Sequence, residues 1–177
     1  MTREYLKKAT LTSQSGASDV HETVQGILDD IETGGDAKAL DYAAKFDQYE
    51  GNVILTREEI EAAKALVPQK LRDDIQFAHD NVRRFAQAQK ETLRNIEVEV
   101  VPGLVTGQKS IPVKGAGCYV PGGRYSHIAS AIMTVTTAKV AGCEHIVACS
   151  PPRPGVGINP SIIYAADLCG ADTILAL

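Results

Sequence analysis

The sequence predicts an α/β protein in which a helical region precedes a parallel sheet. The main observation is an internal repeat, because residues 138–149 align without a gap with residues 166–177. In each copy a helix ends at a glycine, Gly142 or Gly170, and an acidic residue leads into a short strand. These strands are continuously apolar, which is typical of a parallel sheet buried on both faces. Helical patterns dominate the chain before them.

Three short helices are predicted near the start of the chain. Ser18 or Asp19 can cap a first helix, whose apolar stripe contains Val20, Val24, Ile27, Leu28 and Ile31. Gly34-Gly35 ends this helix, and Asp36 can cap a second. The segment Thr56-Arg-Glu-Glu59 has the form of a capping box, so we expect a third helix to begin there.

A longer helix is predicted after Pro68. Its apolar residues at helical spacing are Leu71, Ile75, Ala78, Val82 and Phe85, which we expect to face inward. The charged residues fall on other faces, and His79 is interpreted as part of the same solvated surface. No residue before Asn95 indicates chemistry.

Residues 95–113 alternate between apolar and acidic side chains. Ile96, Val98 and Val100 point one way and Glu97 and Glu99 the other, which is the pattern of a half-buried strand. Pro102-Gly103 then turns the chain back. This segment is predicted to be a structural hairpin.

The loop at residues 115–127 is the strongest candidate for a binding site. An apolar strand, Gly117 to Val120, meets the break Pro121-Gly122-Gly123 and then a long apolar helix pattern, residues 128–141. Free N–H groups at a helix N-terminus favour an anion. The dinucleotide fingerprint is incomplete, because Val120 stands where a third glycine is expected. From the residues alone, an anionic ligand and a plain structural turn both remain open.

Composition excludes several classes of protein. The net charge is −4, and lysine and arginine are scattered among few aromatic residues, so nucleic acid is not an expected partner. No apolar run approaches the roughly 20 residues that span a bilayer, and the start lacks a signal peptide's apolar core. We therefore expect no membrane association and a cytoplasmic location. The four cysteines form no C-x-x-C pair and are interpreted as free packing thiols.

Several motifs together resemble the N-terminal part of the histidinol dehydrogenase family. They include Gly117-Cys-Tyr-Val-Pro-Gly-Gly123, Ala138-Lys-Val-Ala-Gly142 and Cys149-Ser-Pro-Pro152, with Gly34 to Leu40 near the start. Within the family, the segment from Gly122 to Met133 is closer to the sulfopropanediol dehydrogenase branch than to histidinol dehydrogenase proper. This departure argues against histidinol as the substrate.

The resemblance implies a fold and a set of cofactors. Residues 1–94 would be a helical region, and residues 95–177 the first part of an incomplete, Rossmann-like nucleotide-binding domain. NAD and zinc are the implied cofactors, and a homodimer is the implied assembly. Tyr119, Pro121, Gly122 and Gly123 would bind NAD. The family's catalytic Glu-His pair and zinc ligands would lie downstream of Leu177, so no catalytic or metal-binding residue is assigned within the chain.

These implications lead to expectations about the chain by itself. It would be the N-terminal part of a longer enzyme and would not catalyse the reaction alone. Its last strand, Thr173 to Leu177, would expose an apolar edge, which favours aggregation or partial folding.

A small anionic substrate is predicted from Arg124 and His127. A sulfonate is a permanent anion that such donors at a helix start can bind, with Ser126 as a candidate cap. The predicted reaction is the NAD-linked oxidation of 2,3-dihydroxypropane-1-sulfonate through an aldehyde to 3-sulfolactate. The alternatives are histidinol dehydrogenase itself, and a non-catalytic module that binds a nucleotide or a protein partner.

Overall fold

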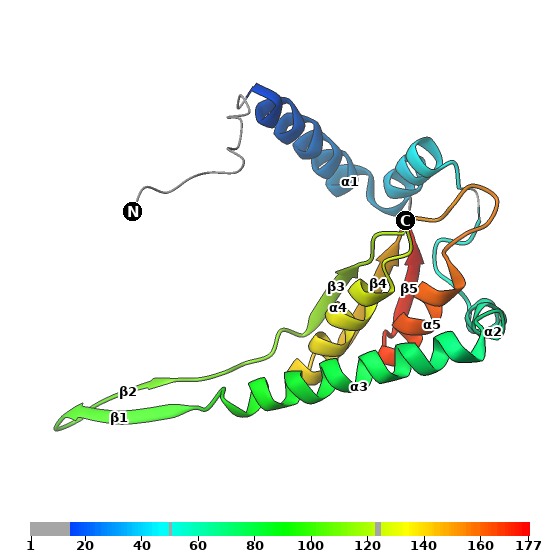
Figure 1. Ribbon diagram of the computed structural model, residues 1–177. Coiled ribbons are helices and arrows are strands. Elements are labelled where there is room, and N and C mark those ends of the chain that lie inside the picture. The colour runs from blue at the N-terminus through cyan, green and yellow to red at the C-terminus, as the bar shows by residue number, and fades with distance from the viewer. Residues whose placement is uncertain (1–14, 50, 123–124) are drawn as a thin grey trace, which may run out of the picture. The chain divides into compact units, whose positions relative to one another are not determined.

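A computed structural model describes residues 15–49, 51–122 and 125–177 (Figure 1). The chain divides into two compact units, Met1–Tyr42 and Ala43–Leu177. In chain order the described elements are α1 (Ser15–Asp47), α2 (Arg57–Ala65), α3 (Gln69–Glu91), β1 (Ile96–Val101), β2 (Leu104–Gln108), β3 (Gly115–Tyr119), α4 (Ile128–Ala141), β4 (His145–Ser150), α5 (Pro160–Cys169) and β5 (Thr173–Ala176).

The helix α1 contains the break that the two glycines predict. Gly35 has φ 59° and ψ −149°, which interrupts the helical geometry and separates the two predicted helices. The apolar stripe of the first helix is not buried as expected, since Val20, Val24 and Leu28 are exposed. The segment after the break reaches back to the first helix through polar side chains, since the Tyr42 hydroxyl donates to Asp30 Oδ2 at 2.7 Å and Lys38 pairs with Asp30 at 3.8 Å.

The start of α2 confirms the predicted capping box. The Glu59 N–H donates to Thr56 Oγ1 at 3.2 Å, and the Thr56 N–H donates to Glu59 Oε2 at 2.7 Å. These two bonds satisfy backbone donors that a helix start leaves free.

The helix α3 packs the predicted face on the core except at its last predicted residue, since Ile75 is buried and Leu71, Ala78 and Val82 are half-buried against the core. Its buried residues are Ile75, His79 and Ala86, which repeat at helical spacing. Phe85, expected inside, is 67% exposed, because the next residue, Ala86, takes the inward position. His79, expected on the surface, is only 6% exposed, and its Nδ1 lies 3.0 Å from Asp80 Oδ1. The predictions for Phe85 and His79 were wrong because the stripe that faces the core is wider than predicted and includes His79 and Ala86.

The parallel sheet has the strand order β3-β4-β5. The helices α4 and α5 pack against each other and against these strands, so both lie on one face (Figure 1). Two consecutive crossovers of the same hand, advancing in the same direction, place their helices on the same side. Residues facing these helices are buried, among them Cys118, Ile146, Ala148, Ile174 and Ala176.

The opposite face of the sheet differs from the expectation. The sequence predicted burial on both faces, but Tyr119 is exposed and its neighbours Val147, Cys149 and Leu175 are half-buried. The continuously apolar strands therefore fill the core on one side only, within the described residues of this unit.

The outer edge of β5 is covered, contrary to the expectation of an open edge. Ile54 forms an antiparallel bridge with Leu175. The Leu55 N–H donates to the Ile174 carbonyl at 3.0 Å, and the Ala176 N–H donates to the Val53 carbonyl at 2.8 Å. A short extended segment from before α2 therefore pairs with the backbone groups that the sequence interpretation left free.

The ends of both repeat copies confirm the predicted glycine stops. Gly142 and Gly170 follow α4 and α5 with φ 100° and 94°, a left-handed conformation that favours glycine. The acidic residue after the second stop is structural. Asp172 Oδ2 accepts from the Ile146 N–H at 2.8 Å and so joins the starts of β4 and β5.

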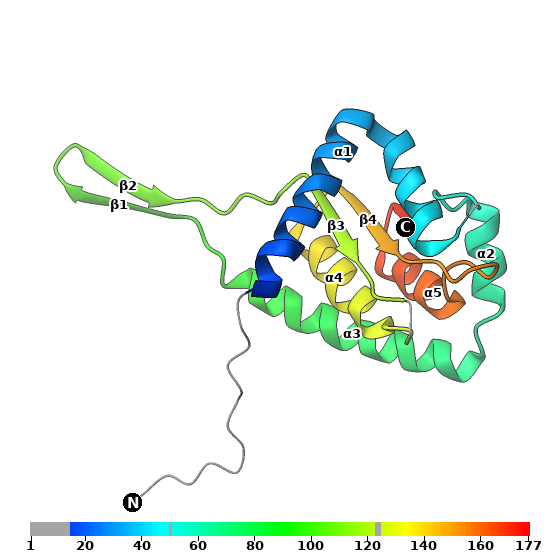
Figure 2. The same ribbon diagram turned by 90° about the horizontal axis from the view of Figure 1, so that it is seen from above.

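The strands β1 and β2 form the predicted antiparallel hairpin. It turns at Gly103, where φ is 85°, and the Gly103 N–H donates to Glu99 Oε1 at 2.7 Å. Figure 2 shows the hairpin extending away from the sheet and from α3 and α4 of the same unit.

Two composition-based predictions can be compared with the structure. All four cysteines are free thiols as predicted, and all except the half-buried Cys149 are buried. In the part of the chain that the structure describes, no helix combines the length and apolar character needed to cross a membrane.

Candidate cofactor site at the carboxyl edge of the sheet

The predicted binding residues gather where the parallel strands end. β3, β4 and β5 end at Tyr119, Ser150 and Ala176, and their carboxyl ends meet at one edge of the sheet, called here the carboxyl edge. The loops 120–127 and 151–159 leave this edge and lead into α4 and α5. In open α/β sheets this edge is where ligands bind.

Tyr119 presents its side chain to solvent at the end of β3. It is 61% exposed and lies opposite Cys149 in the strand register. Burial raises the pKa of the Cys149 thiol, and its Sγ donates to the Leu177 carbonyl at 3.2 Å. Cys149 is therefore a protonated packing residue, and the exposed aromatic ring of Tyr119 is the group available to a ligand.

The loop after Tyr119 is held closely against the sheet. The Val120 N–H donates to the Cys149 carbonyl at 2.7 Å, and the His127 N–H donates to the Pro121 carbonyl at 3.2 Å. Gly122 is buried between them. A Cβ atom at Gly122 would lie 2.5 Å from Ser150 Oγ and 3.2 Å from the Pro151 carbonyl oxygen. Any larger residue would require the Ser150 side chain to rotate and the contact with Pro151 to loosen.

The other residues predicted in this loop, Gly123 for the cofactor and Arg124 and His127 for the substrate, have different outcomes. Gly123 and Arg124 lie outside the described residues. His127 is exposed and occupies the N-cap position of α4, where no described side chain accepts a capping hydrogen bond. The prediction that Ser126 caps this helix was wrong, because the chain enters the helix one residue later.

Two polar atoms at this edge were missed by the sequence interpretation. Ser150 Oγ and Arg153 Nε are buried and have no hydrogen-bond partner among the described residues. Buried polar groups are usually paired, so each is a candidate contact for a bound water or ligand. The position of Ser150 could have indicated it, because Ser150 is a polar residue at the end of an apolar strand, just before Pro151-Pro152.

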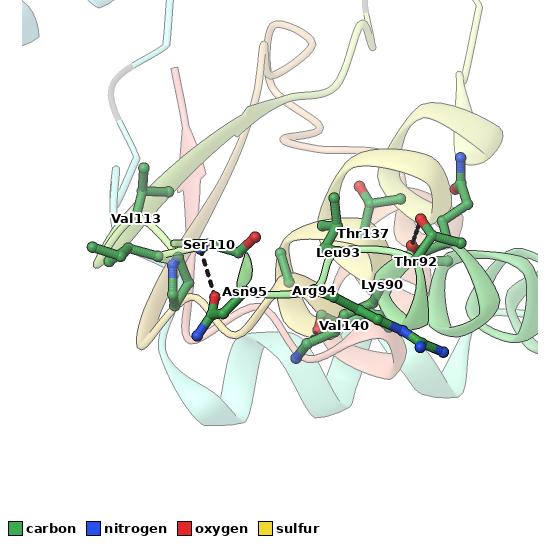
Figure 3. Close-up of a pocket in the computed structure, with 14 residues that line it drawn as sticks. Lys90, Thr92, Leu93, Arg94, Asn95, Ser110, Val113, Thr137 and Val140 are labelled. Atoms are coloured by element: carbon green, nitrogen blue, oxygen red, sulfur yellow. Dashed lines mark hydrogen bonds between the residues drawn. The ribbon is translucent and has the colours of Figure 1, made fainter. Parts of the chain in front are cut away.

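A large cavity lies elsewhere in the same unit, at the root of the hairpin. Its volume is about 1010 Å³, and its 14 lining residues come from the ends of α3 and α4 and from the segments that flank the hairpin (Figure 3). The Asn95 side chain accepts from the Ser110 N–H at 3.0 Å across this root. Lys90 Nζ donates to the Val140 carbonyl at 2.7 Å and so caps the end of α4. The cavity lies where the parallel strands begin and is separate from the carboxyl edge.

Comparison with known proteins identifies the family. A family model described as histidinol dehydrogenase matches residues 11–177. The chain belongs to the histidinol dehydrogenase family.

Individual members of the family cover the chain almost completely. It is 75% identical over 177 residues to sulfopropanediol 3-dehydrogenase of Ruegeria pomeroyi, a match that spans 100% of the chain and 41% of that protein. It is 39% identical over 168 residues to histidinol dehydrogenase of Methanosarcina barkeri, spanning 94% of the chain and 39% of that protein. The chain thus spans about two fifths of the length of these relatives.

A solved structure of the family confirms the predicted fold class. The crystal structure of histidinol dehydrogenase from Elizabethkingia anophelis matches with a TM-score of 0.81 and 30% identity. The match covers 98% of this chain and 38% of that one. The parallel sheet preceded by helices is therefore an arrangement shared with that structure.

The carboxyl edge fits the NAD that the family resemblance implies. Tyr119 offers an exposed ring on which a planar base can stack. Ser150 and Arg153 offer buried donors that have no partner among the described residues, and such donors suit phosphate or hydroxyl oxygens. Gly122 allows the loop to lie close to the end of β4.

The described residues do not fit a zinc site. Among residues 15–49, 51–122 and 125–177 there is no group of three or more His, Cys, Asp or Glu side chains that could hold a metal ion. No residue of the described chain is therefore assigned to zinc.

Proposed function

We propose that the full-length polypeptide is an NAD-linked dehydrogenase that oxidises 2,3-dihydroxypropane-1-sulfonate through an aldehyde to 3-sulfolactate. The observation that carries this proposal is the 75% identity to sulfopropanediol 3-dehydrogenase, maintained over all 177 residues. The family membership supports oxidation of an alcohol, and the similarity to this relative favours a sulfonated substrate over histidinol.

The chain's contribution would be to position the cofactor. NAD supplies the hydride acceptor when bound. Tyr119 would hold a ring of the cofactor by stacking, while Pro121, Gly122 and Gly123 would form the adjoining wall. Ser150 and Arg153 would donate hydrogen bonds to its polar atoms. Because Gly122 lies against the end of β4, this wall is positioned by the sheet itself.

The substrate's sulfonate would be bound by Arg124 and His127. His127 is exposed at the N-terminus of α4, where the first N–H groups of the helix also favour an anion. Arg124 is a permanent cation whose planar fork suits the oxygens of a sulfonate. Replacing either residue should raise the Michaelis constant for the sulfonate far more than that for NAD.

The remaining parts of the proposal concern the whole protein. The catalytic Glu-His pair and the zinc ligands would come from the remainder of the full-length polypeptide, so the 177 residues alone would not turn over substrate. We also propose a cytoplasmic homodimer with no nucleic-acid or membrane partner. The functional boundary would fall between residues 94 and 95, although α2 and α3 belong to the same compact unit as the sheet.

A substrate panel on the full-length protein tests this function. With NAD and zinc present, we expect NADH formation from 2,3-dihydroxypropane-1-sulfonate, with kcat/KM at least about 100-fold above that for histidinol. Two NADH per sulfonate would indicate oxidation through to the carboxylate. Faster turnover of histidinol would identify a histidinol dehydrogenase, and NAD binding without turnover of either alcohol would identify a non-catalytic module.

A further inference from the structure

The hairpin β1–β2 is an isolated structure within its own compact unit. Every residue of both strands is exposed, and the two strands pair with each other rather than with the parallel sheet. Asn95 and Ser110 fix its root through the hydrogen bond already described. Figures 1 and 2 show from two directions that it extends beyond the ends of α3 and β3.

The two faces of the hairpin differ in chemistry. In the strand register Val98 lies opposite Thr106 and Val101 lies opposite Leu104. The register shifts between Glu99 and Val101, so Val100 has no paired residue on β2. The apolar face of the hairpin consists of Ile96, Val98, Val101 and Leu104, with Thr106 and Gln108. The other face carries Glu97 and Glu99 on β1, opposite Gly107 and Val105 on β2, so its two charged side chains lie beside one aliphatic residue. An exposed apolar face backed by an acidic one is the pattern of a sheet that is covered on one side.

An uncovered hairpin of this size would be only marginally stable. Two-stranded hairpins in water generally need a third strand or a packed helix to persist. The four aliphatic residues of the apolar face are each between 50% and 54% exposed, so about half of the surface of each is still to be buried. The strand edges also present unpaired backbone groups that a further strand can use.

We propose that the apolar face of the hairpin docks onto the remainder of the same full-length polypeptide. The chain spans 41% of the length of its sulfopropanediol dehydrogenase relative, so more than half of such a polypeptide is available to cover the face. The strands contain 6 and 5 residues, and only about half of them face one side. Each partner in a stable protein complex contributes roughly 20–30 residues, so a second copy held by this face alone would dissociate. A tethered segment needs no such area, because its effective concentration is in the millimolar range.

Photo-cross-linking in the full-length protein tests the occupant. Val98→p-benzoylphenylalanine places a reactive group on the apolar face, and Glu97→p-benzoylphenylalanine is the matched control on the acidic face. We expect Val98 to give a cross-linked product at monomer mass, joined to a peptide from outside residues 1–177, and the Glu97 control to give little product. A product at twice the monomer mass would assign the face to a second copy and overturn the proposal.

Hydrogen exchange on the unmodified full-length protein provides a second readout that does not depend on a substitution. The amides of residues 96–108 should exchange at least about tenfold more slowly than those of an unstructured peptide with the same sequence. Exchange at the rate of the free peptide would show an uncovered hairpin and would also overturn the proposal.

Discussion

The two crossover helices, α4 and α5, end in the same way but begin differently. Both stop at a left-handed glycine, Gly142 or Gly170. The start of α5 is closed by Asn159, whose side chain accepts from the Ser161 N–H at 2.9 Å, with Pro160 as the first helical residue. The start of α4 has His127 at the N-cap, and no described side chain caps it.

The shared helix ends reflect the fold, whereas the different helix starts point to a ligand at only one of the two helices. A left-handed glycine is a common way to end a helix and turn the chain into the next strand, and it recurs in both copies of the repeat. A side-chain cap satisfies N–H groups that a ligand can satisfy instead. The uncapped helix is the one whose preceding loop carries the family motif, which agrees with a ligand at α4 and a purely structural role for α5.

The largest effect is expected from Gly122→Ala in the full-length enzyme. The new Cβ would lie 2.5 Å from Ser150 Oγ and 3.2 Å from the Pro151 carbonyl oxygen, and because both groups are packed at the end of β4 we expect the loop before α4 to shift. A misplaced binding wall should lower kcat/KM for NAD by about 100-fold, or about 2.7 kcal/mol. Steady-state kinetics at varied NAD concentration measure this loss.

Two further variants make that prediction specific. Adding Ser150→Ala removes the nearest clashing atom and should restore part of the lost activity. Gly26→Ala in α1 is the control, because nothing lies within 4 Å of a Cβ there, and it should leave the kinetics unchanged. Wild-type kinetics in Gly122→Ala would show that the loop does not need this close approach.

Asp167→Asn should have the next largest effect, on stability. Asp167 near the end of α5 bonds Lys64 Nζ at 2.6 Å and also pairs with Arg57, so it joins α5 to α2. Burial alone would raise the pKa of Asp167, but the hydrogen bonds from Lys64 and Arg57 outweigh it and hold the pKa below 3.8. Breaking this partly buried cluster should cost about 2 kcal/mol at neutral pH, measured by urea unfolding of the full-length protein.

The pH dependence checks the cause of that loss. A carboxyl whose pKa is lowered by folding stabilises the protein above its unfolded pKa of about 3.9, and this contribution disappears as the pH falls through the folded value. The gap between wild type and Asp167→Asn should therefore close as the pH falls below about 3.9 and through the lowered pKa of the folded state. Asp74→Asn removes an exposed pair with Lys70 and should cost less than about 0.5 kcal/mol. If Asp74→Asn lost as much stability as Asp167→Asn, the partly buried ion pairs of Asp167 would be no stronger than an exposed pair.

Tyr119→Ala should raise the Michaelis constant for NAD by about tenfold, which corresponds to the loss of one stacking contact. Tyr119→Phe keeps the ring and should stay within about twofold of wild type. Unchanged turnover and an unchanged Michaelis constant in Tyr119→Ala would show that this exposed tyrosine does not contact the cofactor.

The smallest effect is expected from substitutions at the two N-cap residues, which compare the starts of α4 and α5 directly. Asn159→Ala removes a cap and should lower the free energy of unfolding by about 1 kcal/mol. His127→Ala removes no capping bond and should change that energy by less than about 0.5 kcal/mol. Equal losses would mean that His127 also stabilises its helix, and the contrast between α4 and α5 would fail.

Local signals in the sequence were sufficient for much of the fold. The capping box at Thr56, the glycine stops and the hairpin turn at Gly103 depend on backbone chemistry within a few residues, and all were predicted. The buried face of α3 was predicted at Ile75 but not at its end, because Phe85 and Ala86 differ by only about 100° around the helix and tertiary packing decides between them. The single helix-covered face of the sheet also depends on the direction of the crossovers, which no local pattern encodes.

The residues of the candidate site also fall into those that the sequence predicted and those that only the structure shows. The resemblance selected Tyr119 and Gly122, and the structure adds the physical reason for a glycine at residue 122, its approach to Ser150. Ser150 and Arg153 carry no motif of their own, and their unpaired atoms are recognisable only once β4 and its loop are folded. The predicted NAD and sulfonate contacts stay predictions that the variants above test.

The segment Val53–Leu55 also determines how the sheet can be enlarged in the full-length protein. Because this segment pairs antiparallel with β5, a further parallel strand cannot join at that edge. Among the described residues, the outer edge of β3 carries no strand partner. A new strand would have to join there, and a crossover of the usual hand from β5 would then pass over the face that carries Tyr119. The direction of strand addition would reverse at β3, and the crevice that such a reversal opens would lie beside Tyr119.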